Sequence, residues 1–195
     1  MGRERDSIGR WTAITAISPV PLWWRLWLAV NFRIVAFRRR IGRPSAVERN
    51  LRSLAFIGFA HWGVFHRVPT RGAPWKARRL PHHYLLFESN FNGAGAEYIE
   101  AFCRVITLGI KGLWHGAYQV PPPLPVTPFQ RHIDERKLPT GHYYTAYPSA
   151  STKMVNAALE LRPKLAQFAR DSKGLESQAF QARYQGFISR VQGLI

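Results

Sequence analysis

Few side chains in this sequence could do chemistry, and histidines are the most numerous of them. None of the seven histidines belongs to an H-E-x-x-H motif, and His82 and His83 are neighbours in an expected strand, where adjacent side chains point to opposite faces. That arrangement is poor for chelating one ion, so we predict no metal site. A haem iron needs only one axial histidine. His115, after an expected helix, and His142, at the start of an expected strand, are the candidates for that role.

An acidic side chain interrupts the otherwise apolar stretch LLFESNFNG at residues 85–93. In a strand, Glu88 and Asn90 share one face, and the opposite face is the better core face. Glu88 therefore faces either solvent or a cavity, and in a cavity its pKa would rise so that it could act as an acid or base. We take Glu88, Asn90 and Asn92 as candidate ligand-binding residues, together with the two histidines. A turn built by the asparagines and Gly93 would need no ligand.

Other catalytic motifs are missing from the sequence. It contains no G-x-S-x-G, Walker or dinucleotide-binding glycine pattern. The single cysteine, Cys103, excludes an internal disulfide framework and a multi-cysteine zinc site. It falls beside Phe102 in a helical pattern, where we expect it to act as a small apolar residue.

A helix rich in tryptophan is the most unusual element that the sequence predicts. In residues 22–37, arginines and alanines form one narrow stripe and nearly every other side chain is apolar. The run is short for a membrane span and contains two arginines. A core helix is the plain alternative, but tryptophan and arginine are typical anchors at membrane interfaces. We therefore expect membrane contact through six side chains: Trp23, Trp24, Trp27, Arg38, Arg39 and Arg40.

Positive charge is concentrated in the N-terminal part of the chain. Of 28 basic residues, 16 lie in residues 1–80 beside three acidic ones, and the formal net charge of the chain is +17. Such a field attracts polyanions, either nucleic acid or an anionic bilayer. Residues 83–91 lack the basic and aromatic strand pattern of ferredoxin-like RNA-binding proteins. We therefore favour an anionic membrane surface and do not expect nucleic acid as a partner.

The remaining patterns predict an α+β fold. We expect strands at residues 9–18, 54–69, 82–91 and 141–148, and main helices at 22–37 and 93–114. Their order is βαββαβ, the ferredoxin-like plan, which implies a four-stranded antiparallel sheet with both helices on one face.

The C-terminal third is expected to add a crossover and further helices. Five prolines between Pro121 and Pro128 predict an extended segment. A helix capped by Ser149 or Ser151 follows, with a kink or break at Pro163, and then a last amphipathic helix. We expect residues 1–150 to form the ferredoxin-like domain and residues 151–195 a helical extension packed on it or on a partner.

Several of these segments resemble a known family. The turn SNFNG at residues 89–93 with the following AEYIEAF, and the strands at 59–62 and 143–148, resemble bacterial proteins of the dimeric α/β-barrel superfamily related to dye-decolourising peroxidases. The resemblance covers roughly residues 9–150 and implies a ferredoxin-like fold with pairing of two sheets. Asn92 replaces the acid often found before the glycine, and the chain has one such unit where the haem peroxidases have two.

These observations lead to one main hypothesis and one rival. We expect a bacterial, non-secreted, cytoplasmic protein, peripheral to the inner membrane, that binds anionic lipid and holds a small apolar ligand or a partner protein. The strand at residues 54–68 is apolar on both faces, which favours a homodimer through the sheet. The rival, which the resemblance permits, is a haem-dependent or cofactor-free monooxygenase or peroxidase.

Overall fold

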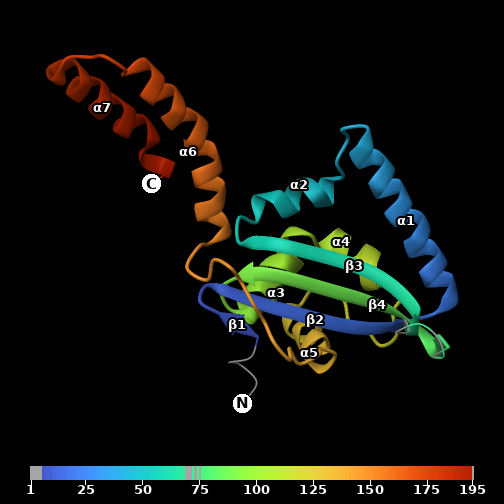
Figure 1. The fold of residues 1–195 in the computed structure, drawn as a ribbon. Coiled ribbons are helices and arrows are strands. Elements are labelled where there is room, and N and C mark those ends of the chain that lie inside the picture. The colour runs from blue at the N-terminus through green and yellow to red at the C-terminus, as the bar shows by residue number, and fades with distance from the viewer. Residues whose placement is uncertain (1–5, 69–71, 73, 75, 195) are drawn as a thin grey trace. The chain divides into compact units, whose positions relative to one another are not determined.

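The computed structural model describes residues 6–68, 72, 74 and 76–194. The chain divides into two compact units, Met1–Pro148 and Ser149–Ile195. The elements of the first unit are shown in Figure 1: β1 (Ser7–Ile8), β2 (Trp11–Val20), α1 (Leu22–Arg40), α2 (Ala46–Ser53), β3 (Ile57–Val68), β4 (Arg78–Asn92), α3 (Gly95–Val105), α4 (Thr107–Trp114) and α5 (Val126–Glu135). The second unit contains α6 (Thr152–Asp171), α7 (Ser177–Val191) and a 3-10 turn at Gln192–Leu194.

The first unit is built on one antiparallel sheet, in which four strands lie in the order β1-β2-β4-β3. β2 pairs with β4 along its whole length, from Trp11 opposite Asn92 to Val20 opposite His83. β3 and β4 are neighbours in the sheet, with irregularities at both ends of their pairing. The α+β class and the four-stranded antiparallel sheet are therefore confirmed, and β2, β3 and β4 correspond to the first three expected strands.

The expected fourth strand is wrong. Residues 141–148 form no strand, and the fourth strand is the two-residue β1 instead. The free edge of β2 is already used, because Leu138 N donates to Thr15 O at 2.8 Å and Ile17 N donates to Arg136 O at 3.2 Å. Tyr144 and Tyr147 are about three-quarters exposed, at 75% and 76%, so these aromatic side chains do not anchor the segment in the core.

Helix boundaries also differ from the periodic pattern. The helix expected at 93–114 is two helices, α3 and α4, separated at Ile106, whose φ of −124° is outside the helical range. α2 forms in the basic connection after α1, where Ser45 and Glu48 make a reciprocal capping box. α5 begins within the proline-rich segment, and α6 continues through Pro163 without a break.

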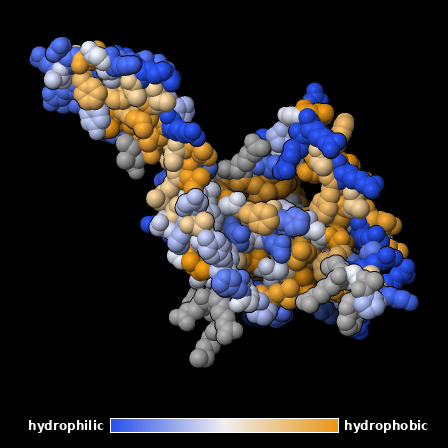
Figure 2. All heavy atoms as spheres, viewed as in Figure 1, coloured by the Kyte–Doolittle hydropathy of each residue, from blue (hydrophilic) through white to orange (hydrophobic). Residues whose placement is uncertain are grey.

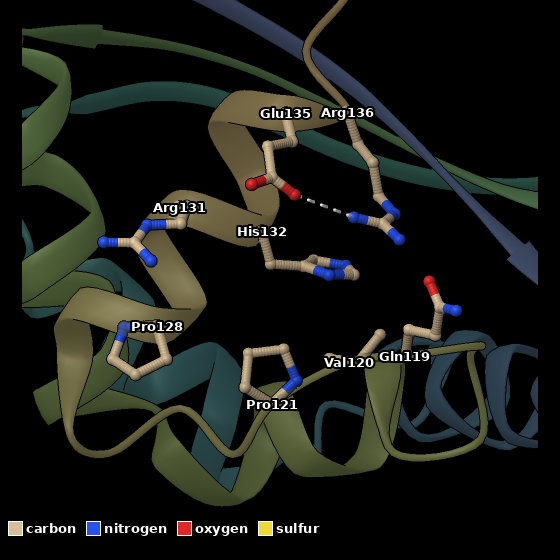
Figure 3. A pocket seen from close by; sticks show the side chains of 8 residues that line it. All are labelled: Gln119, Val120, Pro121, Pro128, Arg131, His132, Glu135 and Arg136. Carbon is tan, nitrogen blue, oxygen red and sulfur yellow. Dashed lines mark ion pairs between the residues drawn. The ribbon is translucent and has the colours of Figure 1, made fainter.

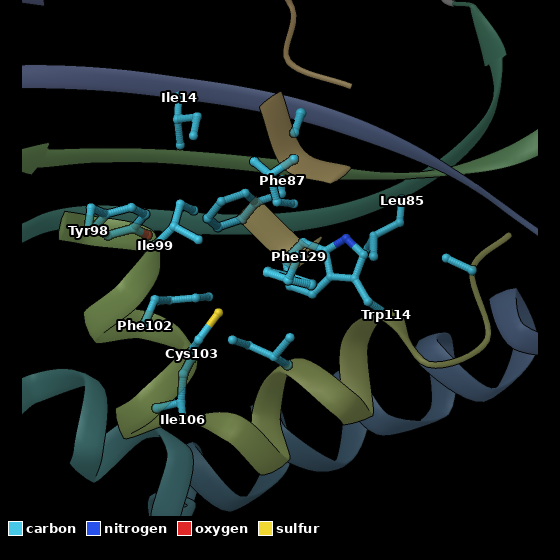
Figure 4. Packing of buried hydrophobic residues seen from close by; sticks show 14 of the residues in the cluster. Ile14, Leu85, Phe87, Tyr98, Ile99, Phe102, Cys103, Ile106, Trp114 and Phe129 are labelled. Carbon is cyan, nitrogen blue, oxygen red and sulfur yellow. The ribbon is translucent and has the colours of Figure 1, made fainter. Parts of the chain in front are cut away.

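The core lies between one face of the sheet and the helices α3, α4 and α5. In Figure 4, Leu85 and Phe87 of β4 point toward Phe102 and Cys103 of α3 and Trp114 of α4. Cys103 is fully buried, as expected of a small apolar residue, and burial raises the pKa of its thiol to about 12. The thiol is therefore neutral and shielded at physiological pH.

A polar pair inside this core is fully bonded. The hydroxyl of Tyr98 donates to Ser89 Oγ at 2.9 Å, and Ser89 Oγ donates to the Phe59 carbonyl at 2.7 Å. Burial raises the pKa of Tyr98, so the phenol stays neutral. Because a buried polar group is costly only when it lacks a partner, the chain of bonds can fix α3 against two strands.

The second unit is a helical hairpin. Ser151 caps α6 by accepting a hydrogen bond from Met154 N at 3.2 Å, as the sequence predicted for one of two serines. Phe168 of α6 stacks on Phe187 of α7 with ring centroids 4.6 Å apart. This aromatic contact joins the two helices.

An ion pair links Asp6, just before β1, to Lys137, which lies in the segment that runs along the edge of β2. Asp6, which is 8% exposed, pairs with Lys137 and accepts a hydrogen bond from Thr140 N at 3.2 Å. Burial raises the pKa of Asp6, but the hydrogen bonds from Lys137 and Thr140 outweigh it and hold the pKa below its ordinary value of 3.8. The carboxylate therefore stabilises the fold at neutral pH, and this contribution is lost as the pH falls through the lowered pKa.

We predict that Asp6→Asn lowers the free energy of unfolding at pH 7 by about 1–3 kcal/mol, because Lys137 loses its charged partner. The difference between variant and parent should shrink as the pH falls below the ordinary pKa of 3.8 and through the lowered pKa of Asp6 in the folded protein. Urea unfolding at pH 7 and at pH 3 measures both values. Asp134→Asn, at an exposed position of α5, is the control. Equal urea midpoints for Asp6→Asn and the parent at pH 7 would contradict the account.

Candidate functional site

α1 presents a continuous row of exposed apolar side chains. They recur every three or four residues, so they lie on one face of the helix and the turn that follows it. Each is between 41% and 62% exposed, and together we call them the apolar ridge: Trp23, Leu26, Trp27, Val30, Ile34, Phe37 and Ile41. In Figure 2 hydrophobic and hydrophilic residues lie side by side over this helix. A monomeric soluble protein rarely exposes so long an apolar surface.

The opposite side of α1 is held in the core by Trp24 and Leu28, which are 5% and 0% exposed. Trp24 Nε1 donates to the Leu113 carbonyl at 3.1 Å, and its ring stacks on Trp27 with centroids 4.4 Å apart. Trp24 is therefore buried in the core and does not lie on the surface, where the predicted membrane contact would need it. Trp24 is an anchor that fixes α1 on α4, while Trp23 and Trp27 remain on the surface.

The third side of α1 is basic. Arg25, Arg33 and Arg40 share the polar stripe of the helix, and α1 contains no acidic residue. Its last turn holds Arg38, Arg39 and Arg40, where positive charge also suits the helix dipole. All the charged side chains of α1 are thus cations.

The three terminal arginines have different surroundings. Arg39 pairs with Glu48 at 3.0 Å. Burial raises the pKa of Glu48, but its bonds to Ser45 and Arg39 keep the pKa below the ordinary value. Arg38 Nε is 3.5 Å from the Arg43 carbonyl, and Arg40 is exposed. Arg39 therefore fixes the α1–α2 corner, whereas Arg38 and Arg40 have no carboxylate partner among the described ion pairs.

Within the described ranges, no helix combines the length and apolar character needed to span a bilayer. α1 has one face buried against the protein and one face of exposed apolar side chains. That combination suits a helix that lies along an interface.

Glu88 lies on the face of the sheet away from the helices, which is where both sequence alternatives placed it. Its carboxylate oxygen lies 3.6 Å from His61 Nδ1, and the two side chains are 41% and 53% exposed. Asn90 shares this open face of the sheet, and Asn92 Nδ2 donates to the Arg10 carbonyl at 3.1 Å. Glu88, His61 and Asn90 therefore form a partly exposed polar surface on the sheet. Asn92 helps to fix the β1–β2 turn.

The candidate histidines do not join Glu88. His115 caps α4, and its ring lies 6.3 Å from that of Trp24 on the helical side of the sheet. His142 is exposed in the irregular segment. No described hydrogen bond or ion pair connects either ring to Glu88, and no three His, Cys, Asp or Glu side chains among the described residues could hold a metal ion.

The two histidines also do not fit a haem. His115 borders a cleft of about 420 Å³ between α4 and the prolines at 121–123, but its ring is exposed at the rim. A haem ligand needs an apolar slot around the porphyrin and an enclosed axial position. Neither residue provides that enclosure.

One buried histidine was not among the candidate residues predicted from the sequence. His132 on α5 is 4% exposed, and Figure 3 shows its ring between Arg136 and Gln119 in a cleft of about 440 Å³. Burial, reinforced by the charge of Arg136, lowers the pKa of His132 to about 4, so the ring is neutral at pH 7. Its spacing from the buried Phe129 and Ile133 on α5 is the signal that could have identified it.

The packing of the Trp24 ring against the end of α4 can be tested by substituting two glycines. A Cβ at Gly116 would overlap the Trp24 ring, whereas a Cβ at Gly112 would make an ordinary contact of 3.8 Å with Trp27. We predict that Gly116→Ala lowers the free energy of unfolding by about 1–3 kcal/mol through overpacking. Gly112→Ala is the matched control and should cost nothing, because alanine also favours the helix. Thermal unfolding measures the stability of both variants, and equal stability for the two would refute this packing of Trp24.

Comparison of the chain with known protein families, with curated proteins and with solved structures gives no match. The function of the protein must therefore be inferred from the geometry of the chain itself. The apolar ridge, with its arginine border, is the feature of that geometry most unlike an ordinary protein surface.

Proposed function

We propose that this protein binds the surface of anionic membranes through α1, without crossing them. The observation that carries the proposal is the apolar ridge, seven large side chains held outward by the burial of Trp24 and Leu28 on another face. An interfacial helix buries its apolar face about 5–10 Å into the boundary between headgroups and acyl chains. Tryptophan at positions 23 and 27 suits this layer, where an amphipathic ring can meet both environments.

The charge around the ridge favours a bilayer over a second copy of α1. Two copies packed ridge to ridge would bring Arg33, Arg38 and Arg40 toward arginines of the other copy, with no acidic residue on α1 to offset them. Anionic lipid attracts each basic side chain near the surface by about 1 kcal/mol. Burial of a large apolar side chain adds about 1.5–3 kcal/mol when it is complete. Both contributions act together only at a surface that is both apolar and negative.

We also propose that the first unit is a ferredoxin-like unit in which the last strand of the βαββαβ plan is reduced to a single bridge, in line with the family resemblance. Support comes from the antiparallel bridge between Ala16 and Lys137, which lies where a fourth strand would pair with β2. The open face of the sheet, with Phe59 48% exposed beside the His61–Glu88 pair, would then be available to a protein partner or a second copy.

The membrane proposal is tested by co-sedimentation with vesicles of phosphatidylglycerol and phosphatidylcholine. We expect the parent to bind, and the double variant Trp23→Ser/Phe37→Ser to bind at least about tenfold more weakly, because two exposed ridge side chains are lost. Arg33→Gln/Arg40→Gln should weaken binding to anionic vesicles and make the remaining binding less sensitive to salt.

The matched control is Tyr144→Ser/Tyr147→Ser, which removes two aromatic side chains that are 75% and 76% exposed and lie outside α1. It should bind as the parent does. A parent that stays in solution at low salt, or ridge and control variants that bind equally, would rule out the proposal.

A further inference from the structure

A second group of cations gathers at the end of the sheet where β3 and β4 approach their connection. In Figure 1 the beginning of α1 lies at this same end. Arg67 of β3 stands directly opposite Arg79 of β4 in the register. Like charges placed directly across two strands repel each other. No described ion pair gives either arginine a carboxylate partner.

Two histidines and a third arginine complete the group. The rings of His66 and His83 stack with centroids 5.1 Å apart, and Arg25 Nη1 lies 3.3 Å from His83 Nε2. Arginine can only donate, so Nε2 of His83 accepts and the ring is neutral in this arrangement. We call these five residues the basic cluster: Arg25, His66, Arg67, Arg79 and His83.

The cluster concentrates positive charge around two histidine rings. Burial and the positive charge of Arg25 lower the pKa of His83. The pKa of His66 is lowered by burial and by the charges of Arg25, Arg67 and Arg79, and protonation of His83 would lower it further. Arg25 acts on both rings, and no acidic group appears among the described residues that shift either pKa. An anion placed here would relieve the repulsion and raise both pKa values.

We propose that the basic cluster is a binding site for a phosphate-type oxyanion. The planar guanidinium groups of Arg67 and Arg79 can each donate two hydrogen bonds to phosphate oxygens, and Arg25 adds a third cation from α1. The phosphate could belong to a free ion or to a lipid headgroup, which present the same oxygens. This inference does not rest on membrane binding by the apolar ridge, because the cluster uses other side chains.

The test uses the full chain and inorganic phosphate at pH 7, with the histidine ring signals followed by NMR. We expect saturable shifts for His66 and His83, assigned by His66→Gln and His83→Gln, while the signal of His142 stays unchanged. Arg67→Gln/Arg79→Gln should weaken phosphate binding by about tenfold or more, since two charge-assisted contacts are lost. Phosphate should raise the melting temperature of the parent and have little effect on this variant.

Arg10→Gln/Arg104→Gln is the control, because it removes the same charge while Arg10 lies at the opposite end of the sheet and Arg104 lies on α3. It should bind phosphate as the parent does. Ring signals that do not move, or that move equally in the cluster variant, would overturn the site.

Vesicle co-sedimentation separates the two sources of phosphate. If lipid headgroups occupy the cluster, Arg67→Gln/Arg79→Gln should lose more affinity for phosphatidylglycerol vesicles than the charge-matched control loses. If free phosphate is the ligand, the two variants should bind vesicles equally while only the control still binds inorganic phosphate. The two proposals can fail separately. If Trp23→Ser/Phe37→Ser binds vesicles as the parent does, the membrane proposal fails, but the result of the phosphate titration is not affected.

Discussion

The packing of Trp24 against the end of α4 determines how every other face of α1 is used. Gly116 leaves room for the indole ring, and the Leu113 carbonyl accepts its N–H. With Trp24 and Leu28 facing the core, the helical period turns Trp23, Trp27 and the rest of the apolar ridge outward. A helix that is apolar on nearly all sides could be buried entirely in a larger protein. Here only one face finds a partner within the described chain, and the remaining apolar surface needs a different environment.

Charge then decides which environment is suitable. The arginines at both ends of α1 leave the ridge in a field of one sign. Glu48, the described carboxylate that pairs with an α1 arginine, is already engaged by Arg39 and by the cap of α2. Water solvates the arginines but not the ridge, and a neutral apolar partner would suit the ridge but not the arginines. An anionic interface suits both. The basic cluster near the start of α1 extends the same positive field to the end of the sheet.

Local periodicity was sufficient to predict much of this structure, whereas contacts between distant segments were not predictable. Alternation correctly separated Leu85 and Phe87 from Glu88, because side chains alternate in any strand. Trp23, Trp24 and Trp27 could not be told apart, because the choice depends on Gly116, about ninety residues further along the chain. The strand expected at 141–148 failed because β1 and residues 136–138 already use the edge of β2. Arg67 opposite Arg79 depends on an irregular register that no sequence pattern reveals.

Spin labels on two faces of α1 test the central claim most directly. Val30 lies on the apolar ridge and Ala36 on the arginine stripe, and both are exposed. Cysteines introduced there can be labelled selectively, because Cys103 is buried and its thiol has a pKa of about 12. On phosphatidylglycerol vesicles, the label at Val30→Cys should become accessible to oxygen and protected from a water-soluble nickel complex, while the label at Ala36→Cys stays accessible to the nickel complex. Equal access of the nickel complex to both labels on vesicles would contradict the account.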